Sequence, residues 1–196
     1  MRQTVTPIPV FAVLLIVACG GGPANQSDAT PSDGSATIAA TDASANKLVV
    51  PGARLDRPAG WKFETPSSSM RLAEAGIPGP GGEALLTVFF FGQGGGGGTE
   101  ANLQRWAGQI VAEAGTEPER DAFEVGDYSV ATIGVEGTLQ PSRMGGGPTE
   151  PTPDSKLIGA VVEGPGGPWF FKITGPADTV TAAEPAFDAM LRSISP

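Results

Sequence analysis

EALLTVFFF, residues 83–91, is the strongest β-strand signal in this chain of 196 residues. Its last part is apolar at every position, which indicates a strand that is covered on both faces. Two further apolar runs, KLIGAVVEG (156–164) and PWFFKITG (168–175), flank the sequence PGG at residues 165–167. Because proline and glycine favour tight turns, these two runs are expected to pair as a hairpin.

Shorter strands are expected on either side of these runs. Residues 61–64 and 70–75 have the composition of strands and surround the loop TPSSS. Met70 and Leu72 alternate with Arg71 and Ala73, a pattern typical of a sheet with one solvated face. Residues 127–139 (DYSVATIGVEGTL) form another predicted strand.

The clearest helix signal covers residues 99–114. Thr99 is expected to be its N-cap, and Gly115 is expected to end it. The apolar residues recur at helical spacing and so form a single stripe. This stripe consists of Leu103, Trp106, Ala107, Ile110 and Ala114.

The end of the chain predicts a second helix, in which Pro185 either kinks the helix or opens its second part. Residues 142–155, rich in glycine and proline, are expected to be a loop. One side of the second helix is apolar: Val180, Ala183, Phe187, Met190, Leu191 and Ile194. The predicted fold class is therefore α+β, an antiparallel β-sheet with a mid-chain helix and a C-terminal helix packed on it, in one domain over residues 47–196.

The N-terminus carries a short apolar segment that ends Ile-Val-Ala before Cys19, the only cysteine of the chain. About a dozen helical residues rise only about 18 Å, too short for a hydrocarbon core of about 30 Å. The segment resembles the lipobox of bacterial lipoprotein signal peptides. This resemblance implies that residues 1–18 are a signal peptide and that acyl chains such as palmitate are attached to Cys19. The alternatives are an ordinary secretory signal with an incidental cysteine, or a buried thiol.

The segment after the cysteine is expected to be a tether. Residues 19–46 are rich in Ala, Ser, Thr and Gly and cannot bury enough apolar area to fold. The lipobox resemblance implies a lipid-anchored, extracytoplasmic protein of the bacterial cell envelope. Because Gly20 replaces the aspartate linked to inner-membrane retention, it further implies the periplasmic face of the outer membrane, where the host has one.

Composition excludes several kinds of function. The formal net charge of −9 argues against binding of nucleic acid through a basic surface. The chain has no histidine, which rules out Ser-His-Asp and Cys-His catalysis and histidine metal sites. We therefore expect no enzyme activity, catalytic residue, metal or cofactor.

Other motifs have ordinary interpretations. The run GQGGGGG at residues 92–98 lacks the Gly-Lys-Ser/Thr of a phosphate loop, so a connector is expected. Glu117, Glu119 and Asp121 lie in a polar stretch where solvated charge is the usual explanation, although a carboxylate-based hydrolase is an alternative. Residues 149–155 lack the ligand spacing of a calcium loop.

Four residues are candidates for a partner or ligand surface: Arg105, Phe91, Trp169 and Phe171. Arg105 could recognise a carboxylate or a partner's backbone, or simply face solvent beside a buried Trp106. Consecutive aromatic residues on a strand point to opposite faces, so some rings in the two aromatic clusters could remain uncovered and form an apolar groove.

The order of these signals resembles a group of uncharacterised bacterial secreted or lipid-anchored proteins over residues 58–193. It is also similar to the PsbP-like α/β sandwich, a likeness at the level of the fold. Neither resemblance supplies catalytic residues. The matching pieces are Gly60-Trp61, Ser69-Met70-Arg71, Phe90-Phe91-Gly92, Asn102, Arg105-Trp106, and residues 159–162 and 170–176.

Three functions follow from these expectations. The first is a membrane-anchored, non-catalytic binding or assembly module for an envelope partner. The second is a carrier or sensor of an apolar small molecule, suggested by the surplus of aromatic residues. The third is the carboxylate-based hydrolase, which requires two acids to converge in a cleft.

Overall fold

The computed structural model describes residues 46–141 and 148–196, which belong to one compact unit. Cys19, the predicted signal peptide and nearly all of the predicted tether lie outside the described residues. Within the described part, none of the helices has the length and apolar character needed to cross a membrane.

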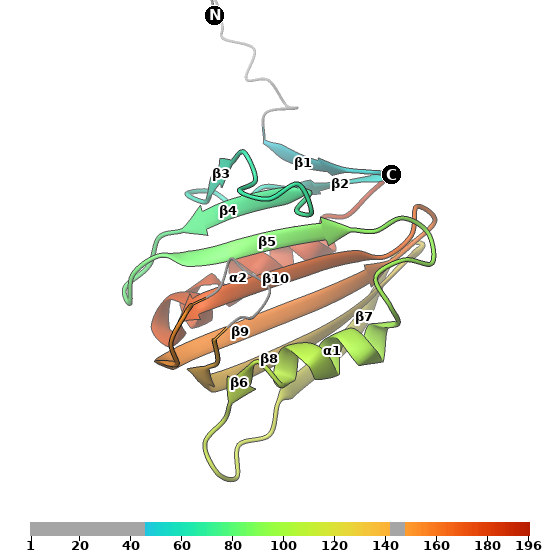
Figure 1. Cartoon of the computed structure of the whole chain (residues 1–196). Helices are drawn as coiled ribbons and strands as arrows, with labels where there is room; N and C mark the ends of the chain where they lie inside the picture. Colours follow the sequence, from blue (N-terminus) through green and yellow to red (C-terminus); the bar gives the residue numbers. More distant parts are fainter. Residues whose placement is uncertain (1–45, 142–147) are drawn as a thin grey trace, which may run out of the picture. The chain divides into compact units, whose positions relative to one another are not determined.

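The predicted fold class is confirmed: the domain is α+β, and both helices pack on an antiparallel sheet (Figure 1). The helices are α1 (Thr99–Ala107) and α2 (Ala177–Arg192). The first strands are β1 (Lys47–Val50), β2 (Ala53–Asp56), β3 (Lys62–Glu64), β4 (Ala73–Ile77) and β5 (Ala84–Phe90). The later strands are β6 (Ile110–Val111), β7 (Glu119–Val125), β8 (Tyr128–Leu139), β9 (Thr152–Glu163) and β10 (Trp169–Pro176).

The main sheet has the strand order β3-β4-β5-β10-β9-β8-β6, and β7 also pairs with β8. The predicted hairpin is present, because β9 and β10 pair antiparallel and Phe171 lies opposite Ala160. On its other side β10 pairs with β5, so that Phe170 lies opposite Phe89. The three most apolar runs within residues 47–196 are therefore neighbours at the centre of the sheet.

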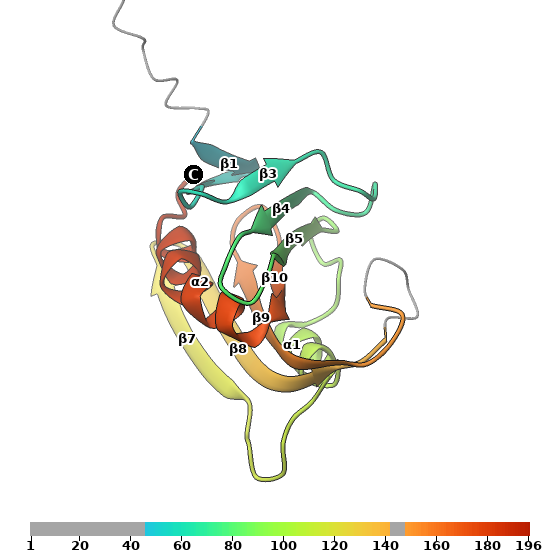
Figure 2. The same ribbon diagram turned by 90° about the vertical axis from the view of Figure 1, so that its left-hand side faces the viewer.

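The two helices lie on opposite sides of this sheet (Figures 1 and 2). On the α2 side, the core also includes residues of the small β1–β2 sheet, which the sequence did not indicate. On the α1 side, a smaller core holds Leu103, Trp106, Ile133 and Phe170. Alternation along β10 produces this division, because Phe170 faces α1 whereas Trp169 and Phe171 belong to the α2 side.

The expected orientation of Met70 and Leu72 is wrong. Strand β4 begins only at Ala73, and Ala73, Ala75 and Ile77 are its buried residues. Met70 is 59% exposed and Leu72 is 36% exposed. The inward-facing row therefore consists of smaller residues than the sequence pattern suggested.

The mid-chain helix is shorter than predicted. It ends at Ala107, with Gly108 as its C-cap, and its N-cap is Gly98 rather than Thr99. Ile110 is buried as predicted, but as part of β6, where it pairs with Leu139. Strand pairing with a distant part of the chain therefore ends the helical stripe, and Ala114 is exposed.

Helix α2 runs from Ala177 to Arg192 and includes Pro185, so its second part is not opened there. Strand β7 was not expected, because its residues read as a polar stretch. It is an edge strand paired only with β8 and rich in exposed charges, which is common for strands at the edge of a sheet. Strand β9 begins at Thr152, inside the predicted loop.

Candidate functional site

Helix α1 covers only part of its side of the sheet. It packs on β8 and β9, whereas no described helix covers the same side of β4 and β5 (Figure 1). This part of the sheet lies next to α1, and polar side chains project from it on the side away from the main core.

A row of polar residues crosses this part of the sheet. Glu74 of β4 lies opposite Thr87 of β5, and Thr87 lies opposite Lys172 of β10. Lys172 in turn lies opposite Gly159 of β9. Because residues directly opposite each other share a face, Glu74, Thr87 and Lys172 project to the α1 side.

Lys172 is half-buried in this row. Its Nζ donates a hydrogen bond to Oε1 of Gln109, just after α1, at 3.2 Å. Burial lowers the pKa of Lys172 below its ordinary value, and the positive charges of Arg71 and Arg105 lower it further. The positive charges of Arg71 and Arg105, from distant parts of the sequence, therefore disfavour the charged form of Lys172.

Arg71 forms an ion pair with Glu74, with 2.8 Å between Nη1 and Oε1, and both side chains are largely buried. The backbone amide of Ser67 also donates to Glu74, at 2.8 Å. Burial raises the pKa of Glu74, but the hydrogen bonds from Ser67 and Arg71 and the charge of Arg71 outweigh it, so the pKa is lowered. The one acid of the row is thus a carboxylate held by Arg71.

Arg105 lies exposed on α1 and donates a hydrogen bond to Oδ1 of Asn102. Asn102 is buried, and its amide nitrogen donates to the carbonyl oxygens of Gly96 and Gly98, both at 3.0 Å. Asn102 therefore links the arginine to the glycine-rich connector. It was not among the candidate site residues, although a polar residue on the buried side of a helix is a signal for such a role.

Phe91 is 45% exposed at the end of β5. Its ring stacks on Phe89, with 6.2 Å between centroids, and lies 5.8 Å from the ring of Phe170. Phe89 is half-buried and lies on the same side of the sheet as Lys172. The exposed aromatic edge therefore adjoins the row of polar residues.

Trp169 and Phe171 do not belong to this surface, which corrects the sequence prediction. Both have 0% exposure and lie in the core on the α2 side. Because successive side chains of a strand point to opposite faces, Trp169 and Phe171 lie on the other side of the sheet from Phe170 and Lys172. The surplus of aromatic residues that suggested an apolar carrier is therefore largely used in the packed core.

The glycine-rich connector packs on an aromatic ring. Gly96 has φ of +81°, and a Cβ at this position would lie 2.5 Å from Cε2 of Phe170. The connector also presents carbonyl oxygens to Asn102. Both contacts agree with a connector and give no support to an anion-binding loop.

A hollow of about 190 Å³ lies between β7, β8 and α2. Four acids are among its lining residues: Glu119, Asp121, Glu184 and Asp188. Glu184 pairs with Lys156 at 2.5 Å and Asp188 with Arg192 at 2.7 Å. No group of three metal-ligating residues occurs in the described part of the chain. Two of the four acids, Glu184 and Asp188, are therefore neutralised by basic partners.

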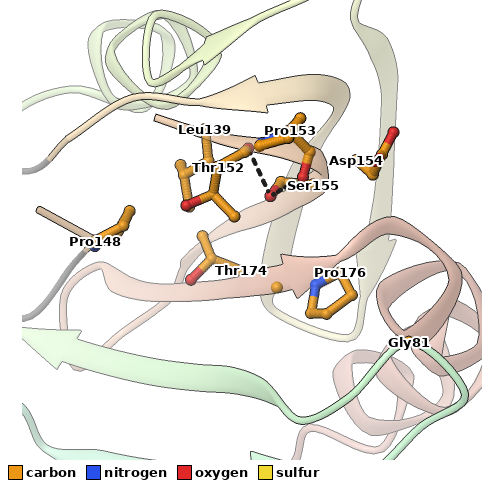
Figure 3. A pocket seen from close by; sticks show the side chains of 10 residues that line it. Gly81, Leu139, Pro148, Thr152, Pro153, Asp154, Ser155, Thr174 and Pro176 are labelled. Atoms are coloured by element: carbon orange, nitrogen blue, oxygen red, sulfur yellow. Dashed lines mark hydrogen bonds between the residues drawn. The ribbon is translucent and has the colours of Figure 1, made fainter. Parts of the chain in front are cut away.

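A second hollow, of about 460 Å³, is lined by the ends of β8, β9 and β10 (Figure 3). The hydroxyl of Ser155 donates to the carbonyl oxygens of Thr152 and Pro153, at 3.0 and 3.3 Å. Among the described residues that line this hollow, Asp154 is the only charged one. With the Ser155 hydroxyl engaged locally, the described lining of this hollow offers fewer charged groups than the row around Lys172.

The Lys172 patch, defined as Arg71, Glu74, Lys172, Arg105, Phe89 and Phe91, is therefore the candidate site. Within the described residues, neither Lys172 nor Arg105 forms an ion pair with an acid. Their hydrogen-bond partners Gln109 and Asn102 are neutral amides. The patch can donate hydrogen bonds and attract negative charge.

Comparisons with known proteins identify no family. No protein-family model matches the chain, and no curated protein matches it. Among solved structures, the chain is similar to a crystal structure of PA94 from Pseudomonas aeruginosa, a protein of unknown function for which a regulatory role is suggested. The two share 14% identity with a TM-score of 0.45, over 76% of this chain and 95% of that chain. This likeness carries no argument about function.

Proposed function

We propose that this protein is a lipid-anchored, non-catalytic binding module of the bacterial cell envelope, and that it binds through the Lys172 patch. The observation that carries the proposal is the pair of basic side chains, Lys172 and Arg105, whose hydrogen-bond partners among the described residues are neutral amides, near the stacked rings of Phe89 and Phe91. Charged and aromatic side chains of this kind can bind a partner without catalysing a reaction of it.

The anchor in this proposal is Cys19, acylated after removal of residues 1–18. Two or more acyl chains hold a protein on a bilayer durably, because each buried methylene contributes about 0.8 kcal/mol. A coil of 27 residues or so spans roughly 30 Å, enough to hold the domain clear of lipid headgroups. The proposed location is the extracytoplasmic face of the envelope, on the outer membrane where the host has one.

The anchor is tested by mass spectrometry of the protein purified from membranes. We expect the wild-type chain to begin at an acylated Cys19, and Cys19→Ala to remain unprocessed or leave the membrane. Ser27→Ala, a neutral change in the same segment, should behave as wild type. An unmodified thiol on a protein that fractionates with the cytosol would remove the anchor from the proposal.

The binding face is tested by photo-crosslinking in intact cells. A benzophenone amino acid at Phe91 should capture a specific partner, because this ring is exposed and stacks on Phe89, which lies on the same face as Lys172. The matched control is the same amino acid at Val49, which is 65% exposed on β1. Equal products from both positions, or none from Phe91, would count against this face.

A further inference from the structure

We propose that the ligand of the Lys172 patch is an organic anion, whose carboxylate or phosphate group binds between Lys172 and Arg105 while its apolar part packs against Phe91. This inference rests on the proposed binding function and names the chemical class of the ligand.

The charge of the patch is opposite to that of the whole protein. The chain has a formal net charge of −9, yet Arg71 pairs with Glu74, the only acid in the row, and Lys172 of the same row is bonded to Gln109, just after the helix that carries Arg105. Glu74 is already paired with Arg71. Lys172 and Arg105 therefore leave a local excess of positive charge, and an anion placed between them would relieve their repulsion.

The two basic groups also keep hydrogen-bond donors for a ligand. An ammonium group has three donors, and one hydrogen bond from Lys172, to Gln109, is present. A guanidinium group has five donors, and one hydrogen bond from Arg105, to Asn102, is present. Because Asn102 is itself held by two backbone carbonyls, Arg105 is positioned before a ligand arrives.

Apolar side chains adjoin these donors on one side. Phe89 lies two residues after Thr87 on β5, on the same face, and Thr87 is the residue opposite Lys172. The ring of Phe89 stacks on the exposed ring of Phe91. Leu72, also exposed, is joined to the same strand through its amide, which donates to the carbonyl of Val88 at 2.7 Å. A ligand with both charge and an apolar body therefore matches the patch better than an inorganic ion.

The test uses the full-length protein purified in a non-ionic detergent and titrated with phenyl phosphate, benzoate, inorganic phosphate and benzyl alcohol. Binding is followed by NMR shifts of backbone amides around Lys172 and Gly159. We expect an aromatic anion to bind with Kd below about 1 mM, tighter than inorganic phosphate, and benzyl alcohol not to bind. Preference for phenyl phosphate or for benzoate identifies which anionic group the patch accepts.

Variants locate the binding. Lys172→Gln and Arg105→Gln should each weaken the aromatic anion roughly ten-fold or more, because each removes charged hydrogen bonds. Lys47→Gln and Arg54→Gln, on the β1–β2 sheet, are the matched controls and should leave Kd unchanged. Circular dichroism of each variant checks that it is folded.

The outcomes separate this inference from the proposed function. Failure of both aromatic anions to bind, or equal binding by Lys172→Gln and wild type, overturns the anionic ligand, whereas a partner captured at Phe91 would still support the binding module. Binding that depends on Lys172, in a protein that lacks acylation of Cys19, would support the anion site and remove the anchor.

Discussion

The indole ring of Trp106 lies against the backbone of Gly159, so closely that a Cβ at position 159 would come within 2.2 Å of Cε3. This contact joins α1 to the centre of the sheet. Gly159 is also the residue opposite Lys172. The absence of a side chain at one position of β9 therefore allows the helix that carries Arg105 to lie beside Lys172.

Gly159→Ala should destabilise the domain by about 1–3 kcal/mol, because Trp106 or the helix must move to accommodate a methyl group. Urea unfolding followed by fluorescence measures this loss. Gly134→Ala on β8 is the control, because a Cβ there would make only an ordinary contact, 3.5 Å from Oε2 of Glu119. Equal stability of the two variants would contradict the close packing of Trp106.

Arg71→Ala should cost roughly 3 kcal/mol, because it leaves a largely buried carboxylate at Glu74 without its cation. Lys62→Ala is the matched control, since Lys62 pairs with Glu83 at 3.5 Å on the exposed surface. That loss should stay below about 1 kcal/mol. Unfolding midpoints in urea compare the two variants. Similar losses of stability would show that burial does not increase the cost of breaking the Arg71–Glu74 pair.

Glu74 should contribute to acid unfolding. Its pKa is lowered from 4.5 in the folded protein, so its contribution to stability is present above that ordinary value and is lost as pH falls through the lowered value. Glu74→Gln should therefore make stability fall less steeply between about pH 5 and pH 3. Urea midpoints across this range test the slope, with Glu83→Gln as the control. An unchanged slope in Glu74→Gln would refute the lowered pKa.

The charged form of Lys172 should destabilise the folded protein, whereas the charged form of Glu74 stabilises it. Because the pKa of Lys172 is lowered from 10.5, the unfolded chain binds its proton more tightly, and stability rises with pH between the lowered pKa and 10.5. Glu74, Arg71 and Arg105 are the charged groups around it. Lys172→Met should raise stability at neutral pH and remove this rise, as measured by urea unfolding.

Lys47→Met, at a partly exposed ion pair on β1, is the control for this prediction. It should change neither the stability at neutral pH nor the rise in stability at alkaline pH. Addition of phenyl phosphate should stabilise the wild type and leave Lys172→Met unaffected, because a ligand stabilises the state that binds it. A Lys172→Met variant less stable than wild type at neutral pH would indicate that Lys172 is a structural residue.

Local pattern predicted two of the six residues of the candidate site. Arg105 and Phe91 were singled out because an arginine beside a buried tryptophan and a run of phenylalanines are visible in the sequence. Lys172 was not, because a single lysine in an apolar strand gives no sign of its neighbours. Its place beside Thr87 and Gly159 depends on the register of β10 with β9 and with β5, a strand that is distant in sequence.

The same distinction explains the errors in the elements. The stripe from Leu103 to Ile110 has helical spacing, yet the helix ends at Ala107 because Ile110 pairs with Leu139. The exposed charges of β7 conceal a strand whose partner is β8. In both places a long-range pairing outweighs local propensity.

The amino-acid sequence by itself determined the α+β class, the central apolar strands, the two helices with their buried sides, and the absence of histidine chemistry. These properties depend on residue type and on spacing along a short segment. Only the tertiary structure decided that Trp169 and Phe171 are buried while Phe91 is exposed, and that Lys172 and Arg105 lie on one face. The physical reason is that burial and charge proximity depend on which distant strands and helices pack together, and strand register sets that packing.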